Sequence, residues 1–285
     1  MKTGMVLEGG GMRGIYTVGV LDVCMERAYW PDYVIGVSAG ASNSASYLSR
    51  QQGRGLRTNL DYLEDKRYLS LSNWRKHRSL FGMDFLFRQI PETLDPFDFA
   101  AFAENPCSYT VGVTNVHTGK AEYFGKEAMC KDSTILAASC SIPVFSPPVA
   151  FRGALYCDGG TADPIPFRKA LEDGCQRLIV VLTRHRGYRK PPQRFRPSYQ
   201  HALRSYPALI DTLAHRHTHY NQTLDALWEL EQKGQAIVIA PDAPLPGGTF
   251  EKKRETLMAI YQRGREDALR IWPQIQTWID NRPCD

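Results

Sequence analysis

The sequence predicts an α/β protein: a three-layer α/β/α sandwich around a mainly parallel sheet, followed by a mostly helical C-terminal extension. Two observations lead to this prediction. Short apolar strands alternate with helical patterns up to about residue 185, which is typical of a parallel sheet covered by helices on both faces. Beyond that point two long helical patterns dominate, so we place a soft boundary near residue 185.

The first part of the chain begins with a short apolar strand, Thr3–Leu7, that ends in glycines. Apolar side chains at helical spacing then predict a helix over residues 13–27. The expected elements that follow are a buried strand at 33–35, a helix rich in small residues at 38–48, an irregularly helical polar stretch at 53–80 and an aromatic-rich segment at 81–90.

The middle of the chain predicts more strands than helices. Residues 109–116 and 121–124 are two strands around a turn at 117–119. The expected elements that follow are a helix at 132–140 with Asp132 or Ser133 as its N-cap, a strand at 155–157, a helix at 166–173 and an apolar strand at 177–182. In the C-terminal part, helices at 201–233 and 251–279 flank a strand at 236–240 and a Pro/Gly-rich turn at 241–248.

Composition excludes several classes of protein. A hydrophobic content of 43% and a charged content of 23% are ordinary for a soluble globular protein. No stretch approaches the ~20 apolar residues of a spanning helix, and the apolar run at the N-terminus is too short for a signal peptide. The seven cysteines are odd in number and form no Cys-x-x-Cys pair, which favours reduced thiols and disfavours a zinc site. We expect a cytoplasmic protein without a metal.

The positive charge is concentrated in one block. Residues 174–210 hold eight arginines and lysines and no acidic residue. Such a block favours anionic surfaces, including phospholipid headgroups or nucleic acid, but it is equally typical of a solvated loop around Pro191-Pro192. We keep peripheral contact with an anionic membrane as a hypothesis and expect no nucleic-acid partner. The sequence does not indicate an oligomeric state.

Gly36-Val37-Ser38-Ala39-Gly40 matches the G-x-S-x-G elbow, in which a serine lies on a strained turn between a strand and a helix. Gly36 and Gly40 avoid clashes in that turn. The pattern alone is weak and otherwise describes an ordinary Gly/Ser-rich turn. Its position directly after an apolar strand and before a helix favours Ser38 as a nucleophile.

Gly9-Gly10-Gly11-Met12-Arg13-Gly14 offers consecutive backbone N–H groups at the start of a helix, where negative charge is stabilised. These groups could hold the oxyanion of an acyl transfer. Arg13 could orient the loop or neutralise charge, or be an ordinary surface arginine.

The same loop is open to a second interpretation, because Gly9, Gly11 and Gly14 also match the G-x-G-x-x-G dinucleotide fingerprint. That site needs an acidic residue at the end of the second strand, where this chain has Gly36-Val37-Ser38. An NAD-binding or non-catalytic module is therefore the minor alternative.

Asp158-Gly159-Gly160 follows a short strand, so the Asp158 carboxylate could act as a base at the strand's end. The alternative is a common Asp-Gly turn. Histidine is the usual partner of a nucleophilic serine, but none of the seven histidines lies in a comparable motif. This favours a Ser-Asp pair over the Ser-Asp-His triad of α/β-hydrolases, whose elbow usually follows a later strand. Cys157 is a rival nucleophile or, more simply, a small packed residue.

The three motifs in this order resemble the patatin-like phospholipases, above all their bacterial members, over roughly residues 4–184. Two further similarities lie between and after the motifs. Ala138-Ser139-Cys140-Ser141-Ile142-Pro143 is similar to the family's A-S-x-x-x-P segment, and Pro166 falls on a family proline. Asp163-Pro164 departs from a frequent asparagine.

The resemblance implies a catalytic domain at 4–184 with a helical extension at 185–285 packed on it. It also implies Ser38 as nucleophile, Asp158 as base and the residue 9–13 loop as oxyanion hole, with no cofactor. The substrate would be a lipid or a small ester. Its acyl chain would lie against four aromatic-segment residues unless these form the core: Phe81, Phe85, Leu86 and Phe87.

Overall fold

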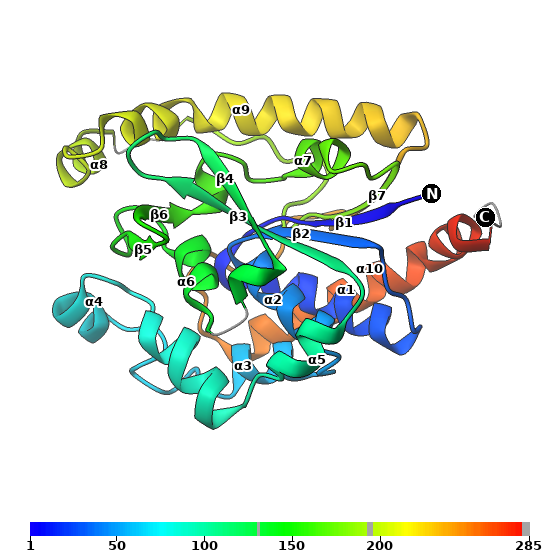
Figure 1. Ribbon diagram of the computed structural model, residues 1–285, viewed down its shortest axis with the longest axis horizontal. Coiled ribbons are helices and arrows are strands. Elements are labelled where there is room, and N and C mark those ends of the chain that lie inside the picture. Colours follow the sequence, from blue (N-terminus) through cyan, green and yellow to red (C-terminus); the bar gives the residue numbers. More distant parts are fainter. Residues whose placement is uncertain (130–131, 193–195, 281–285) are drawn as a thin grey trace.

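The computed structural model describes residues 1–129, 132–192 and 196–280 and shows a mixed sheet between layers of helices (Figure 1). The strands within these ranges are β1 (Thr3–Leu7), β2 (Tyr33–Val37), β3 (Ser108–Asn115), β4 (Ala121–Gly125), β5 (Val149–Phe151), β6 (Ala154–Asp158), β7 (Arg177–Val181) and β8 (Ala236–Ile239). Their hydrogen-bonded order is β5-β6-β3-β2-β1-β7-β8, with β4 paired to β3.

The helices follow the same chain order. They are α1 (Ile15–Glu26), α2 (Ala39–Leu48), α3 (Arg54–Leu60), α4 (Leu71–His77), α5 (Phe99–Glu104), α6 (Thr134–Cys140), α7 (Phe167–Glu172), α8 (Arg196–Ala202), α9 (Pro207–Gln232) and α10 (Arg254–Asp280). Three short segments of the described chain are 3-10 helices: η1 (Gly11–Gly14), η3 (Lys126–Met129) and η4 (Gly159–Thr161). The segment η2 (Phe85–Leu94) is a π-helix.

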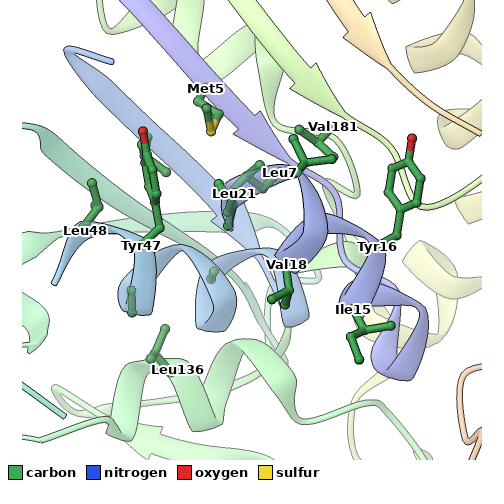
Figure 2. Close-up of a cluster of buried hydrophobic side chains, with 14 of the residues drawn as sticks. Met5, Leu7, Ile15, Tyr16, Val18, Leu21, Tyr47, Leu48, Leu136 and Val181 are labelled. Atoms are coloured by element: carbon green, nitrogen blue, oxygen red, sulfur yellow. The ribbon is translucent and has the colours of Figure 1, made fainter. Parts of the chain in front are cut away.

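The predicted sandwich is confirmed, because alternate residues of the central strands pack on opposite layers. Met5 and Leu7 of β1 lie in one buried cluster with residues of α1, α2 and α10 (Figure 2). Val6, between them, belongs to a second cluster with residues of α7 and α9. Figure 1 shows these two groups of helices on opposite sides of the sheet.

The sheet is parallel in its centre and antiparallel near one edge. The five central strands run parallel to one another: β3, β2, β1, β7 and β8. β4 and β6 run antiparallel to β3, and β5 antiparallel to β6. The paired strands around the turn at 117–119 are as predicted, whereas β5 is an element that the sequence did not indicate.

The C-terminal region joins the same sheet and packs closely on the first helix. A methyl group on Gly19 of α1 would lie 2.2 Å from the Tyr261 carbonyl oxygen, and one on Gly264 of α10 would lie 2.1 Å from that of Tyr16. Both helices therefore need glycine at their crossing. The Tyr16 hydroxyl also donates to Asp267 at 2.9 Å. α10 thus fixes the helix that follows the glycine-rich loop.

Several predicted boundaries shift for local reasons. The helix predicted from residue 13 starts at Ile15, because residues 11–14 form the tighter turn η1. The helix predicted over 201–233 is split into α8 and α9 at Pro207, which occupies a first-turn position that suits proline. No helix in the described ranges has the length and apolar character needed to cross a membrane. Cys130 and Cys284 lie outside those ranges.

Candidate active site

Ser38 lies at the sharp turn between β2 and α2. Its backbone has φ 54° and ψ −129°, a strained conformation for a residue with a side chain. The two glycines of the motif allow the turn: a methyl group on Gly36 would lie 2.6 Å from the Ala41 nitrogen, and one on Gly40 would lie 2.4 Å from the Leu7 oxygen. This is the geometry of the predicted elbow.

The strand register explains how Asp158 reaches Ser38. Gly112 of β3 pairs with Val37, and the next residue, Val113, pairs with Asp158. At both Gly112 and Val113, one edge of β3 is paired with β4. β2 and β6 therefore both pair with the opposite edge of β3. They run toward each other along it, and their C-terminal ends meet. Ser38 and Asp158 are therefore neighbours despite 120 positions of separation.

Backbone contacts hold both residues in place. The Ser38 N–H donates to the Ser139 hydroxyl oxygen at 2.8 Å, and Ser139 donates in turn to the Gly112 carbonyl at 2.7 Å. The Asp158 N–H donates to the Ser141 carbonyl at 2.8 Å. The segment that resembled the family's A-S-x-x-x-P motif thus supports the backbone of both candidate residues.

The Asp158 carboxylate is buried, with 7% of the residue exposed. Burial raises its pKa, because the charged form loses solvation. Its hydrogen bond with the Ser38 side chain, the charge of Arg216 and the Gly160 N–H at 2.9 Å oppose that rise. A raised pKa suits a carboxylate that must accept a proton near neutral pH.

The glycine-rich loop passes directly beside the serine. A methyl group on Gly9 would lie 2.9 Å from the Ser38 Cβ, and one on Gly10 would lie 2.7 Å from the Thr183 hydroxyl oxygen. The N–H groups of Gly9 and Gly10 have no acceptor in the described part of the chain. The Met12 N–H donates to the Thr249 carbonyl at 3.1 Å, which leaves the glycine amides as the candidate oxyanion donors.

Arg13 is buried, with 8% of the residue exposed, so the alternative of an ordinary surface arginine is wrong. Its guanidinium donates to the Thr249 hydroxyl at 3.3 Å. The neighbouring Glu8 accepts hydrogen bonds from the Tyr220 hydroxyl at 2.6 Å and the Thr183 N–H at 2.7 Å. Residues of the C-terminal region therefore secure both ends of the loop.

Two cavities meet at Ser38. The first, which we call the apolar cavity, has a volume of about 940 Å³ that includes space open to solvent. It lies between α2, α6 and the η2 segment, and its walls include Met12, Tyr68, Met83, Phe87, Ile90 and Leu136. Of the four predicted acyl-chain contacts, Phe81, Leu86 and Phe87 line it. Phe85 does not, because it packs edge-on against Tyr62 in the core.

The second, which we call the cationic cavity, has a volume of about 1000 Å³, again including open space. Ser38, Asp158 and the glycine-rich loop form one side of it. Beside apolar and aromatic residues and Glu8, four basic side chains line the rest of it: Arg13, Arg184, Lys190 and Arg216. Ser38, Gly11 and Ile142 line both cavities.

The site offers little support for a histidine triad, a cysteine nucleophile or a metal centre. All seven histidines lie in described ranges, and none lines either cavity. Burial raises the pKa of the Cys157 thiol, which keeps it protonated and favours its reading as a packed residue. No group of three or more His, Cys, Asp or Glu residues suited to a metal ion occurs in the described part.

Sequence reasoning missed the contribution of the C-terminal region. Arg216 and Tyr220 come from α9, and Thr249 comes from the turn before α10. None of them belongs to a motif. The only signal was the basic block that contains Arg184 and Lys190, and it gave no indication of which side chains turn inward.

The fold and site define a class: an α/β protein with a serine elbow that faces a buried carboxylate beside an open glycine-rich loop. The chain belongs to the patatin-like phospholipase family, whose model matches residues 5–171. A second model, for a domain of unknown function (DUF6363), matches residues 206–280.

Individual relatives are distant. An uncharacterized Escherichia coli protein, YjjU, is 26% identical over 270 residues, which is 93% of this chain and 75% of that protein. The lysophospholipase NTE1 of Scheffersomyces stipitis is 26% identical over 62% of this chain but only 11% of its own length. The crystal structure of VipD from Legionella pneumophila superposes with a TM-score of 0.48 at 14% identity, covering 96% of this chain and 67% of that one.

Proposed function

We propose that the protein is a serine acyl hydrolase that cleaves carboxylic ester bonds of lipids, with Ser38 as nucleophile and Asp158 as base. One observation supports the proposal most strongly. The C-terminal ends of β2 and β6 meet on one edge of β3, and this brings the Ser38 hydroxyl next to the buried Asp158 carboxylate. Family membership supports lipid ester hydrolysis in general.

In the proposed first step, the Ser38 Oγ attacks the ester carbonyl carbon and its proton passes to the Asp158 carboxylate. The carbonyl π electrons move to the oxygen, which becomes an oxyanion beside the amides of Gly9, Gly10 and Gly11. Such donors are worth roughly 2.7–4 kcal/mol each in the transition state. When the oxyanion collapses, the alcohol leaves with the proton from Asp158, and the acyl group stays on Ser38.

In the second step, Asp158 accepts a proton from a water molecule that attacks the acyl-enzyme. The second oxyanion forms at the same amides, and its collapse returns the proton to Ser38 and releases the carboxylic acid. One carboxylate thus serves as base and acid in both halves of the cycle. No metal or organic cofactor takes part in these steps.

The apolar cavity supports a fatty acyl chain as the acyl group. Aliphatic, aromatic and thioether side chains form much of its wall beside several polar residues of α2 and α3, and this apolar part favours burial of a hydrocarbon over a polar acid. The lysophospholipase names of the fungal relatives point to the same substrate class. Those relatives share only a small part of their length with this chain.

The test is hydrolysis of p-nitrophenyl esters and phospholipids by the wild-type protein, Ser38→Ala and Asp158→Asn. We expect turnover by the wild type alone. Turnover that persists in Ser38→Ala would refute the mechanism, and a loss of activity on replacing one histidine by alanine would favour the Ser-Asp-His alternative. Tight NAD binding without any turnover would favour the dinucleotide alternative.

We also propose peripheral contact with an anionic membrane, carried by exposed members of the basic block such as Arg189 and Arg204. Binding to anionic liposomes should weaken as salt rises, since the attraction is electrostatic. Binding that is absent or insensitive to salt would remove this part of the proposal.

A further inference from the structure

The cationic cavity holds more positive charge than the proposed hydrolysis needs. We call its four basic side chains the cationic cluster: Arg13, Arg184, Lys190 and Arg216. Within the described ranges, none of the four forms an ion pair with an acidic side chain. Elsewhere in the same block, Arg186 and Arg189 do form ion pairs, with Glu231 and Asp225.

The acidic residues at the cavity are already engaged. Both carboxylate oxygens of Glu8 accept hydrogen bonds, from Tyr220 on one side and from Thr183 on the other. Asp158 faces Ser38 and accepts the Gly160 N–H. Neither carboxylate forms an ion pair with the cluster, but the charge of Glu8 acts on Arg13 and Lys190 and that of Asp158 on Arg216. The four basic groups still outnumber the two carboxylates that line the cavity, so positive charge remains in excess.

The cluster is held in position rather than extended into solvent. The Arg216 Nε donates to the Gly160 carbonyl at 2.7 Å, and the Arg184 guanidinium lies 4.4 Å from the centre of the Tyr188 ring. The Lys190 ammonium lies 5.5 Å from the centre of the Tyr220 ring, and its backbone N–H donates to the Asn221 side chain at 2.8 Å. These contacts fix the charges at the cavity wall.

One polar atom of the cluster has no hydrogen-bond partner among the described residues. The Nε of Arg13 is buried and makes no hydrogen bond in the described part of the chain. Burial, together with the charges of Arg216 and Arg184, also lowers the pKa of Lys190 to about 7. Like charges brought together out of water oppose folding, and an anion among them would offset that cost.

We infer that the cationic cavity binds a phosphate group, and that the substrate is an acyl ester whose anionic phosphate headgroup carries no positive charge of its own. Guanidinium groups pair with phosphate oxygens in two parallel hydrogen bonds, and lysine adds a point charge. A choline or ethanolamine headgroup would bring a further cation into a cluster that already repels itself. The headgroup preference follows from that repulsion.

The two cavities can hold the two ends of such a substrate, because both open at Ser38. The acyl chain enters the apolar cavity, the ester carbonyl lies at Ser38 where both cavities meet, and the phosphate lies in the cationic cluster. A glycerol backbone joins the ester to the phosphate by a few bonds. The substrate assignment rests on the proposed function, whereas phosphate binding by the cluster does not.

The test measures binding of ligands that cannot be hydrolysed. Calorimetry on the full chain would compare three ether lipids with the same alkyl chain below their micelle concentrations: 1-O-alkylglycerol 3-phosphate, 1-O-alkylglycerophosphocholine and 1-O-alkylglycerol. We expect the phosphate ligand to bind at least ten times more tightly than the other two. Since no ester is cleaved, the result is independent of whether Ser38 acts as a nucleophile.

Variants assign the preference to the cluster. Arg184→Gln and Lys190→Gln, measured separately, should each reduce the preference at least tenfold, with unchanged thermal unfolding cooperativity as the check on folding. Arg75→Gln is the matched control, because it removes an exposed charge outside the basic block and outside both cavities. Its preference should equal that of the wild type.

The binding results distinguish a failed inference from the two possible sources of the phosphate. Equal affinity for the three lipids, or a loss in Arg75→Gln as large as in the cluster variants, overturns the inference. Competition by inorganic phosphate as strong as by the phosphate lipid would identify the ligand as a free phosphate. Displacement by the phosphate lipid alone would identify it as a headgroup, and both results keep the phosphate site.

Discussion

The two cavities that meet at Ser38 are built from different parts of the chain by different physics. The apolar cavity takes its walls from residues 11–142, and many of its side chains are of the kind that fill the core. The cationic cavity joins the glycine-rich loop to residues of the C-terminal half, and its side chains repel one another. We therefore expect the apolar cavity to behave like part of the core, and the cationic cluster to lower stability when no anion is bound.

The largest expected effect lies at the junction of the cavities. Asp158→Asn removes the proton acceptor, and hydrolysis should fall by roughly 10²–10⁴-fold, while both cavities keep their walls and their ligands. Steady-state kinetics on a p-nitrophenyl ester and calorimetry with an ether lipid measure the two properties separately. Equal losses of turnover and binding would mean that Asp158 shapes the site instead of taking a proton.

Asp163→Asn is the matched control for that variant. Asp163 is a second, partly buried carboxylate, whose oxygen accepts the Tyr123 hydroxyl at 2.6 Å and which lines neither cavity. An asparagine oxygen can accept the same hydrogen bond. Turnover of this variant should stay within a few-fold of wild type.

The pH dependence of hydrolysis tests the environment of Asp158. Its raised pKa means that the base takes up a proton at a higher pH than an ordinary aspartate, whose pKa is about 3.9. For a neutral ester, kcat/KM should fall about tenfold per pH unit below a midpoint that lies above this value. A midpoint at or below it would contradict the proposed burial of the base. Arg216 is the charged group that faces this carboxylate.

A smaller effect distinguishes the apolar cavity. Leu86→Trp adds bulk to its wall and should lower kcat/KM for long-chain esters by about tenfold relative to acetate esters, as expected for a loss of one to two kcal/mol of apolar burial. Leu94→Trp, at an exposed position of the same η2 segment, should leave the ratio unchanged. Equal shifts in both variants would place the acyl chain elsewhere.

The smallest effect concerns stability at the cationic cavity. The folded pKa of Lys190 is about 7 and its ordinary value is 10.5, so between these values the unfolded chain binds more protons. The free energy of unfolding should therefore rise with pH across this window, by at most about 1.4 kcal/mol per unit. Arg13, Arg184, Arg216 and Glu8 are the charges that face it.

Denaturant unfolding of wild type and Lys190→Gln at pH 7 and pH 9, in buffers free of phosphate, checks this prediction. The rise between the two values should be smaller in the variant. An identical rise would mean that Lys190 keeps an ordinary pKa and that the cluster imposes no repulsion on it.

The sequence revealed what short motifs encode. The elbow at Ser38 needs glycines four residues apart, and the loop at Gly9 needs consecutive residues without side chains, so both leave local patterns. The meeting of β2 and β6 on one edge of β3 left none, because it depends on register between strands far apart in the chain. Arg216 and Thr249 were missed for the same reason, since tertiary packing alone brings them to the loop.

The aromatic segment shows the limit of periodicity. Its residues at 81, 86 and 87 line the apolar cavity while Phe85 packs in the core. Helical spacing identified one face of the segment but could not separate a cavity wall from a filled core, because both need the same apolar side chains. The predicted division at residue 185 stays a prediction.

Covalent labelling tests the central claim most directly. An alkyl fluorophosphonate incubated with the full chain, followed by peptide mass mapping, locates the reactive hydroxyl, and Asp158→Asn reports whether the carboxylate activates it. We expect one adduct, on Ser38, that forms far more slowly in the variant. An adduct on another residue, or ester hydrolysis by a protein whose Ser38 is never labelled, would contradict it.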